Sequence, residues 1–273
     1  MEPTGAPVSE IVYSRNGSGE PVVLVHGIGH RKEAWRPVAT RLAETHDVVA
    51  IDLPGFGASP ALTKSRRDGM DDFADTLETF FAELGIERPH IVGNSLGGAI
   101  ALELAARGSV RTATALSPAG FWTEPGRARA FALLLGLKMT SAAPEPVVRR
   151  IATRRWSRAA AMSTLFAHPG RIDADDFLGD TFALRDCTAF GRVLRAGTRY
   201  SYRARPVVPT TVAWGTKDRI LVPSQAEEAR RRLPHATHVP LPDCGHVPMI
   251  DAPDLITRVI LDRTRSVDLV PAA

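Results

Sequence analysis

The chain has 273 residues, of which 44% are hydrophobic and 23% are charged. This is the composition of an ordinary globular protein, so it excludes a disordered chain and a collagen-like chain. Thirty-four Lys and Arg against thirty Asp and Glu leave a net charge of +4, too small an excess to indicate a nucleic-acid-binding protein. At about 150 residues per domain, the length allows one large domain or two small ones.

The cysteines and the N-terminal segment indicate the cellular compartment in which we expect the protein. Two cysteines, Cys187 and Cys244, are too few for a disulfide framework in a chain of this size, which favours a reducing compartment. The first ten residues lack the basic and apolar regions of a signal peptide, and the small-or-apolar run at 130–137 is too short to span a membrane. We therefore expect a cytoplasmic protein without a membrane span.

Six short β-rich runs alternate with helical patterns along the chain. These runs are apolar and bounded by Gly or Pro, as is typical of strands buried on both faces of a parallel sheet; they are 21–26, 47–52, 89–93, 112–116, 209–214 and 237–241. Apolar residues at helical spacing run from Met70 to Leu84 and stop at Gly85, a common C-terminal signal. The alternation predicts an α/β fold with right-handed crossovers.

One long stretch interrupts this alternation. Residues 121–205 contain helical patterns at 127–139, 147–161 and 177–200, but no convincing strand. Because the strand pattern then resumes, we interpret 121–205 as a helical cap inserted into a core that comprises 1–120 and 206–273. Such a cap would cover the carboxyl edge of the sheet, where open α/β sheets bind ligands. An ordinary second layer of helices is the alternative interpretation.

The most specific motif is Gly93-Asn-Ser95-Leu-Gly97, which follows an apolar strand and precedes a helical pattern that ends at Gly108. In a G-x-S-x-G motif, the serine lies on a tight strand-to-helix turn that exposes its hydroxyl above the sheet edge. The flanking glycines let strand and helix approach closely. The amide of Leu96, at the positive end of the helix, then points at a developing oxyanion. Ser95 is therefore the candidate nucleophile.

A serine hydroxyl needs a base, and in this motif the acid and the histidine follow the serine in that order. His246 is the candidate base because it follows the last predicted strand and precedes a final helical pattern at 253–263. A histidine at this position reaches back over the sheet edge. We expect His30, His168 and the other histidines to be surface or structural residues.

Asp218 is the candidate acid that orients the histidine. It lies in a short loop after the strand at 209–214, from which a carboxylate can hold one tautomer of the imidazole. Its competitors are Asp243, in the loop of the histidine, and Asp251, nearer to the final helix. The loop after the strand at 112–116 is excluded because it contains no carboxylate.

A second oxyanion donor is expected in the loop after the first long strand, where His26-Gly-Ile-Gly29 allows the amide of Ile28 to approach a substrate. The same glycines could begin the dinucleotide motif G-x-G-x-x-G, but its third position is Lys32, which disfavours that interpretation. A glycine-rich turn at 52–59 follows the next strand. We expect this turn to shape the wall of the site without a catalytic role.

Together these motifs resemble the α/β-hydrolase superfamily, and they occur in the family order from about residue 10 to 263: His26-Gly-Ile-Gly29, Asp52-Leu-Pro-Gly-Phe-Gly-Ala-Ser59, Gly93-Asn-Ser-Leu-Gly97, Trp214-Gly-Thr-Lys-Asp218 and Gly245-His246. The resemblance implies a catalytic triad of Ser95, Asp218 and His246. It also implies an oxyanion hole formed by the amides of Ile28 and Leu96, with no metal and no organic cofactor.

The chain departs from the family pattern at three places. Residues 8–14 leave room for little more than one strand before the first long one, so we expect a shortened opening hairpin. Epoxide hydrolases and haloalkane dehalogenases of this fold use Asp as nucleophile, and Ser95 therefore disfavours those activities. The elbow is similar to that of carbon–carbon bond hydrolases, many of which carry Trp where this chain has Val247.

The net charge is unevenly distributed along the chain. Residues 121–205 contain fourteen Arg and one Lys against seven acidic residues, a net charge of +8, which leaves −4 for the rest. Arg192, Arg195 and Arg199 recur at helical spacing and make one helix face basic. This face is either simply solvated, or it attracts an anionic substrate to the cap.

We therefore expect a serine hydrolase that cleaves a small or medium carboxylic ester-like substrate through an acyl-enzyme intermediate. One alternative is a carbon–carbon bond hydrolase, or another non-ester activity on the same triad. Another is a ligand-binding member of the family that has lost turnover. In each case the expected partner is a small molecule, anionic if the basic cap takes part, and not a nucleic acid.

Overall fold

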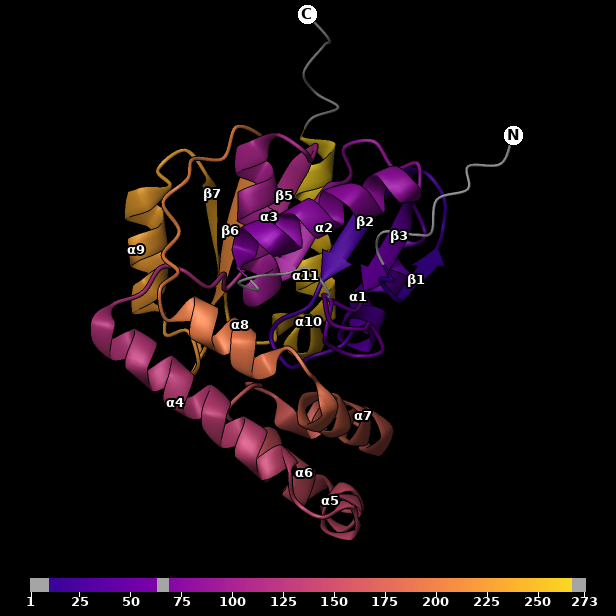
Figure 1. The fold of residues 1–273 in the computed structure, drawn as a ribbon, viewed down its shortest axis with the longest axis vertical. Helices are drawn as coiled ribbons and strands as arrows, with labels where there is room; N and C mark the ends of the chain where they lie inside the picture. Colours follow the sequence, from indigo (N-terminus) through magenta and orange to yellow (C-terminus); the bar gives the residue numbers. More distant parts are fainter. Residues whose placement is uncertain (1–9, 63–68, 267–273) are drawn as a thin grey trace, which may run out of the picture.

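The computed structural model describes residues 10–62 and 69–266. Its sheet has seven strands in the order β1-β3-β2-β4-β5-β6-β7 (Figure 1). The strands are β1 (Tyr13–Asn16), β2 (Glu20–Val25), β3 (His46–Ile51), β4 (His90–Asn94), β5 (Thr112–Leu116), β6 (Thr210–Gly215) and β7 (Thr237–Leu241). All six predicted strands are confirmed, with boundaries that differ by at most one residue.

The strands pair in parallel except at one edge. There β1 runs antiparallel to β3, with Tyr13 opposite Ile51, while each of the other five pairs is parallel. Within the described residues, β1 is the only strand before β2. Of the segment in which the sequence predicted a shortened opening, residues 8 and 9 lie outside the described residues.

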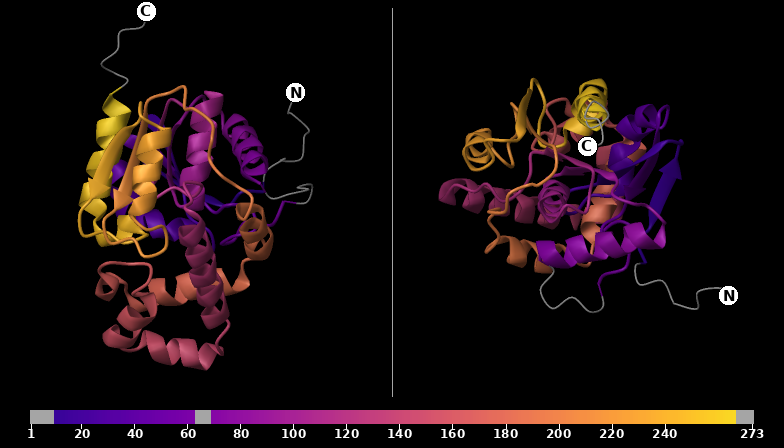
Figure 2. Two further views of the ribbon diagram at one scale, coloured as in Figure 1. Left: turned by 90° about the vertical axis from the view of Figure 1, so that its left-hand side faces the viewer. Right: turned by 90° about the horizontal axis from the view of Figure 1, so that it is seen from above.

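Helices pack on both faces of the sheet. Successive residues of β2 point to opposite faces: Val23 belongs to one hydrophobic cluster and Val22 to the other. The first cluster includes residues of α2 (Met70–Glu83) and α3 (Leu96–Arg107); the second includes residues of α1 (Arg36–Leu42) and α11 (Pro253–Arg265). Seen from above, α2 and α11 lie on opposite sides of the sheet (Figure 2). This confirms the predicted α/β architecture.

A group of helices lies between β5 and β6. It contains α4 (Glu124–Ser141), α5 (Glu145–Ala152), α6 (Arg155–Met162), the 3₁₀ turn η2 (Pro169–Arg171), α7 (Ala174–Asp186) and α8 (Phe190–Gly197). We call residues 121–205 the helical segment. Helices α4 to α7 extend beyond the lower end of the sheet (Figures 1 and 2). The remaining short elements are η1 (Lys32–Trp35), α9 (Ser224–Arg232) and α10 (Pro248–Asp251). No helix in the described ranges has the length and hydropathy needed to cross a membrane.

The prediction of a single helix at 147–161 is wrong, because the structure has two helices there, α5 and α6. The break is at Arg154, whose backbone is extended, with φ −117° and ψ 128°. Side chains replace the lost helical hydrogen bonds: Ser157 Oγ donates to the carbonyl of Ile151 at 2.6 Å, and Arg158 donates to that of Ala152. The carbonyls at the end of α5 are therefore satisfied without a continuous helix.

The predicted helix at 177–200 is also divided, into α7 and α8. Lys138 on α4 donates from Nζ to the carbonyls of Leu184 at 2.7 Å and Arg185 at 2.8 Å, which lie in the last turn of α7. The linker that follows donates two backbone hydrogen bonds to the carbonyl of Gly55. These partners are distant in the chain, so local periodicity could not indicate the break.

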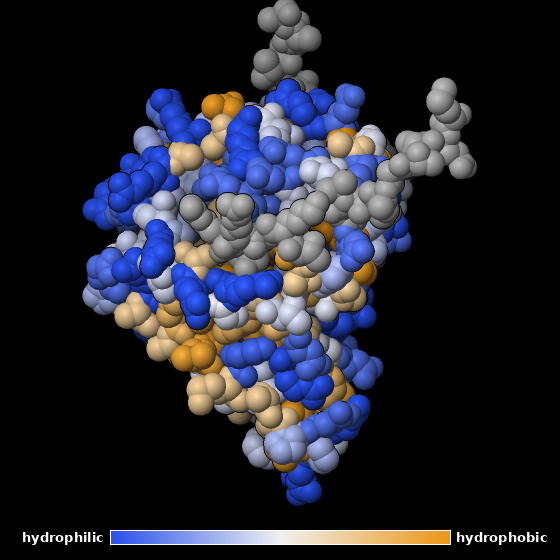
Figure 3. Space-filling view, viewed as in Figure 1, coloured by the Kyte–Doolittle hydropathy of each residue, from blue (hydrophilic) through white to orange (hydrophobic). Residues whose placement is uncertain are grey.

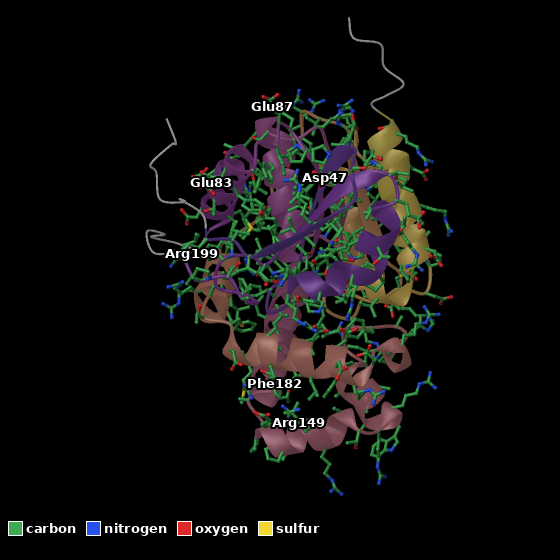
Figure 4. The ribbon with its side chains drawn as sticks, turned by 90° about the vertical axis from the view of Figure 1, so that its right-hand side faces the viewer. Asp47, Glu83, Glu87, Arg149, Phe182 and Arg199 are labelled. Atoms are coloured by element: carbon green, nitrogen blue, oxygen red, sulfur yellow. The ribbon has the colours of Figure 1, made fainter. Side chains whose placement is uncertain are left out.

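Two arginines of the helical segment contact the same aromatic ring. The guanidinium of Arg185 lies 4.4 Å from the centre of the Phe182 ring on α7, and that of Arg149 on α5 lies 5.8 Å from it. Figure 4 shows Arg149 and Phe182 at adjacent positions of α5 and α7. The cation–π contact of Arg149 stabilises the packing of α5 against α7, while that of Arg185 lies within α7. Some of the arginines that give the segment its positive charge therefore make contacts within the segment.

The closest backbone packing of the core lies where β4 meets α3. A Cβ atom added to Gly93 would lie 2.0 Å from the carbonyl oxygen of Gly97, and one added to Gly97 would lie 2.3 Å from that of Val25. Both obstacles are backbone atoms within the sheet and its helix, so they cannot move aside as a flexible side chain would.

We expect Gly97→Ala to lower the free energy of unfolding by about 2 kcal/mol, because the added methyl group forces strand and helix apart. The matched control is Gly136→Ala, since nothing lies within 4 Å of a Cβ at this helical glycine. The control should raise the free energy of unfolding by about 0.5–1 kcal/mol. Urea titrations followed by circular dichroism measure both. Equal effects of the two substitutions would contradict the packing argument.

Candidate active site

The carboxyl ends of the parallel strands meet at one edge of the sheet. The register pairs Val25 with Gly93 and Leu116 with both Asn94 and Ala213, so these strands end side by side. The loops and the helix that start at this edge carry the predicted site residues, namely Ile28, Ser95, Leu96, Asp218 and His246.

Ser95 forms the turn between β4 and α3. Its backbone has φ +56° and ψ −111°, a left-handed conformation that is strained for a residue with a side chain. Three backbone hydrogen bonds hold it: Ser95 N donates to Leu116 O at 2.9 Å, and Ser95 O accepts from the amides of Ala99 and Ala119 at 3.0 Å. The surrounding structure therefore fixes the direction of the Ser95 side chain.

Asp218 and His246 form a buried pair. Nδ1 of His246 donates to Oδ2 of Asp218 at 2.8 Å, and both side chains are almost fully buried. The other carboxylate oxygen accepts the amides of Ile220 and Leu221, each at 2.8 Å. Because an ionised carboxylate only accepts hydrogen bonds, the proton of the neutral imidazole lies on Nδ1, which leaves Nε2 able to accept another proton.

The loop of His246 is tied directly to the serine turn. The Asn94 amide donates from Nδ2 to the carbonyl of His246 at 2.9 Å and to that of Leu116 at 3.2 Å. Ser95 and His246 both line one cavity. Among the described residues no hydrogen bond joins the Ser95 hydroxyl to His246; such catalytic hydrogen bonds often tighten only when substrate is bound.

The two competing carboxylates have other partners. Asp243 is exposed and forms an ion pair with Lys217 at 2.8 Å. Asp251 is buried and accepts the backbone amides of Ala167 at 2.9 Å, His168 at 2.7 Å and Gly245 at 2.7 Å. Of the three candidates, Asp218 is therefore the one whose carboxylate contacts the histidine.

Asp251 also connects the histidine loop to the helical segment. Its amide partners come from both regions, and the carbonyl of Leu165 in the helical segment accepts the amides of His246 at 2.8 Å and Val247 at 3.3 Å. Sequence reasoning missed this role, because the partners of Asp251 are backbone groups up to 84 residues away. The position of His246 thus depends on the segment that surrounds the cavity.

The loop that carries Ile28 lies against the serine turn. A Cβ atom added to Gly27 would lie 3.2 Å from Cβ of Ser95, and both Gly27 and Ile28 line the cavity. Leu96 is the first residue of α3, and the first amides of a helix have no partner within it. The loop of Ile28 and the start of α3 at Leu96 therefore both lie next to Ser95, where the sequence predicts the two oxyanion donors.

Hydrogen bonds of the His26 side chain hold the loop that carries Gly27 and Ile28. Its Nε2 accepts the amide of Leu53 at 2.9 Å, and its Nδ1 donates to the carbonyl of Gly27 at 2.7 Å, so the imidazole is neutral. Burial lowers the pKa of His26 to about 4. The glycine-rich turn at 52–59 supplies Leu53, but none of its residues lines the cavity. The expectation that this turn forms the wall of the site is wrong; the turn supports the loop instead.

The cavity has a volume of about 150 Å³ and is mainly apolar. Its apolar side chains come largely from the helical segment and include Leu134, Leu137, Val148, Ile151, Met162, Leu165, Phe166, Phe177 and Leu184. None of the described residues that line it is Lys or Arg. A hydrocarbon group fits this lining better than a charged group does.

The basic helix face does not reach the cavity. Arg192 and Arg195 lie on the exposed side of α8, Arg199 is exposed just beyond the end of this helix, and none of the three is among the lining residues. The expectation that these arginines orient an anionic substrate at the site is therefore not supported.

A polar pair in the cavity wall was missed by the sequence reasoning. His30 Nε2 lies 3.3 Å from Oδ2 of Asp180 on α7, and both residues line the cavity. Arg31 Nε donates to the other oxygen of Asp180 at 2.9 Å. Burial raises the pKa of Asp180, but the attraction of His30 and Arg31 outweighs burial, so this pKa is lowered. The two halves of the pair are 150 residues apart in the chain, and no local pattern connects them.

The described residues contain no group of three or more His, Cys, Asp or Glu that could hold a metal ion. Cys187 and Cys244 are both buried, and neither forms a disulfide.

Residues 22–259 match the sequence profile of the alpha/beta hydrolase family. The chain belongs to this family. It is 33% identical over 257 residues to the dihydrolipoyllysine-residue acetyltransferase component of the acetoin cleaving system of Cupriavidus necator. The alignment covers 88% of this chain but only 62% of the relative, so this chain spans less than two thirds of the relative's length.

Two further family members show the range of activities among similar proteins. The epoxide hydrolase EphH of Mycobacterium tuberculosis is 33% identical over 197 residues, which are 68% of this chain and 91% of that protein. The crystal structure of a membrane phospholipase A, a bacterial virulence factor, superposes with a TM-score of 0.72 at 27% identity and covers 95% of this chain and 84% of its own. Membership in the family therefore establishes a hydrolase fold but leaves the substrate open.

The buried His26 should make the stability of the protein depend on pH. Its pKa is about 4 when folded against an ordinary value of 6.5, so the unfolded chain binds the proton more tightly. The free energy of unfolding should therefore fall as the pH falls from 6.5 towards 4, by about 2 kcal/mol at pH 5 from this residue alone. Urea unfolding at pH 7 and pH 5 measures the loss. His26→Gln should show a smaller loss than the wild type, and equal losses would contradict the assignment.

Proposed function

We propose that the protein is a serine hydrolase that cleaves carboxylic esters with a small or medium apolar acyl group. One observation carries this proposal: Ser95, on its strained turn, and His246, which is hydrogen-bonded to Asp218, line the same apolar cavity. A serine, a histidine with a free Nε2 and a buried carboxylate are the groups that acyl transfer requires.

In the proposed mechanism, Ser95 Oγ attacks the ester carbonyl while Nε2 of His246 takes its proton. The negative charge that forms on the carbonyl oxygen is stabilised by the amides of Ile28 and Leu96. Collapse of this intermediate breaks the bond to the alcohol, which leaves with the proton from His246, and the acyl group remains on Ser95. Water, activated by the same histidine, then hydrolyses the acyl-enzyme. Asp218 holds the imidazole in the required tautomer and stabilises its protonated form.

We further propose that the helical segment acts as a cap that binds the acyl group. The apolar side chains of α4 to α7 line the cavity, and each buried methylene group contributes about 0.8 kcal/mol to binding. The polar His30–Asp180 pair also lines the wall, and a hydroxyl or carbonyl group of the substrate would find a hydrogen-bond partner there.

The chemistry of the nucleophile separates this proposal from the epoxide hydrolase among the relatives. If the Ser95 hydroxyl opened an epoxide, it would form an ether, which has no carbonyl for water to attack, so the enzyme would not turn over. A carbon–carbon bond hydrolase acting on a diketo acid needs a partner for the substrate carboxylate. No Lys or Arg among the described residues lines the cavity, which favours an uncharged ester instead.

Replacement of the nucleophile tests the reaction. Ser95→Ala should reduce kcat for p-nitrophenyl butyrate by at least about 10⁴-fold and abolish the pre-steady-state burst. The control is Ser141→Ala, because Ser141 also lines the cavity but lies on α4, away from the sheet edge. Full ester hydrolysis by Ser95→Ala would contradict the mechanism. A wild-type enzyme that cleaves a vinylogous diketo acid faster than any ester would overturn the substrate assignment.

A change in cavity size tests the role of the helical segment. Leu137→Trp should lower kcat/KM for an octanoyl ester about tenfold more than for an acetyl ester, because the indole ring occupies space that the longer chain needs. Leu133→Trp is the matched control, since Leu133 is on the same helix but does not line the cavity. A series of p-nitrophenyl esters measures the chain-length profile. An identical change of profile in both variants would contradict the proposed acyl site.

A further inference from the structure

Helix α4 is apolar on two opposite sides. On one side, Leu134 and Leu137 line the cavity. On the other, exposed apolar residues recur at spacings of three and four positions, namely Ala128, Ala132, Leu135, Met139 and Ala142. Leu135 is 50% exposed and Met139 is 70% exposed. A helix that is apolar all round is normally buried on all sides, so the outer side of α4 has the composition of a contact surface.

No charge interrupts this outer side along the middle of the helix. Between residues 130 and 141 the only charged residue is Lys138, and its Nζ is bonded to the carbonyls of Leu184 and Arg185 at the end of α7. In the space-filling view, apolar side chains gather over α4 at the lower left of the molecule (Figure 3).

The exposed apolar surface continues at the end of the molecule farthest from the sheet. Val147 on α5 is 47% exposed and Trp156 on α6 is 68% exposed, and both helices lie beside the lower end of α4 (Figure 1). Of the six large hydrophobic side chains that are strongly exposed in the described ranges, four are in the helical segment. We call these four the apolar tip: Leu135, Met139, Val147 and Trp156.

The surroundings of the apolar tip are positively charged. Residues 128–172 contain eight Lys and Arg but only one acidic residue, Glu145. Three of these arginines, Arg129, Arg150 and Arg154, are exposed, and their guanidinium groups have no hydrogen-bond or ion-pair partner within the described part of the chain. The tip therefore combines apolar side chains that could enter a nonpolar layer with guanidinium groups that are available to an anion.

We propose that the apolar tip docks the protein onto a lipid surface that carries anionic headgroups. Tryptophan, leucine and methionine side chains enter the boundary between headgroups and acyl chains, while arginines bind the headgroup phosphates. Charge complementarity selects this occupant over a second copy of the chain, because a symmetric contact would bring two arginine-rich surfaces together. The proposal does not depend on the proposed function, since Ser95 and His246 take no part in it.

Vesicle sedimentation tests the docking surface with the full chain. The protein should bind phosphatidylglycerol-containing vesicles more tightly than pure phosphatidylcholine vesicles, and added salt should weaken this binding. Leu135→Glu combined with Met139→Glu should reduce binding to the anionic vesicles by about tenfold or more, because it places charges at the boundary. Val207→Glu is the control, since Val207 is 69% exposed but lies outside the helical segment; it should bind like the wild type.

A second pair of variants tests the contribution of the arginines. Arg150→Glu combined with Arg154→Glu should lower binding to the anionic vesicles by about tenfold or more and reduce its salt dependence. Both double variants should keep the circular dichroism spectrum and the Ser95-dependent cleavage of a water-soluble ester, which separates a loss of docking from a loss of folding.

Three results would overturn the proposal. The first is that the wild type does not bind anionic vesicles. The second is that the tip variants and Val207→Glu bind vesicles equally well. The third is that the protein is a dimer that Leu135→Glu dissociates, without vesicle binding, which would assign the surface to a second copy of the chain.

Discussion

The site depends on the close approach of β4 and α3 around Ser95. Neither Gly93 nor Gly97 leaves space for a side chain, because the nearest backbone oxygens would lie 2.0 and 2.3 Å from an added Cβ. The turn between strand and helix is so tight that Ser95 adopts φ +56°. The packing of the sheet edge compensates this strain. The turn places the Ser95 hydroxyl next to the positive N-terminal end of α3.

The histidine loop connects this rigid edge to the helical segment. The side chain of Asn94 holds the loop from the serine turn, and the carbonyl of Leu165 and the carboxylate of Asp251 hold it from the other side. Hydrogen bonds therefore join the helical segment, which lines the cavity, to the loop of His246, the proposed base. A substitution that displaces the loop at Leu165 would move His246 as well, so the wall of the cavity and the proposed base are structurally coupled.

The sequence predicted well those features that depend on local patterns. Buried strands have a continuous apolar signature, and the strand-to-helix turn at Ser95 requires glycines at fixed spacing, so both were placed to within one residue. The contact between Asp218 and His246 followed from the order of the residues along a parallel sheet. Features that depend on distant partners were not predictable. Lys138, on α4, donates a hydrogen bond to a carbonyl in the last turn of α7. The His30–Asp180 pair joins a core loop to the helical segment.

The central claim is that Ser95 forms a covalent acyl intermediate. The most direct test is to mix the enzyme with p-nitrophenyl butyrate, quench the reaction with acid within the burst phase and map the butyryl group by peptide mass spectrometry. We predict that the added mass lies on Ser95 of the wild-type enzyme and that Ser95→Ala carries no butyryl group. A quenched enzyme that turns over the ester but carries no adduct, or carries it on another residue, would contradict the account.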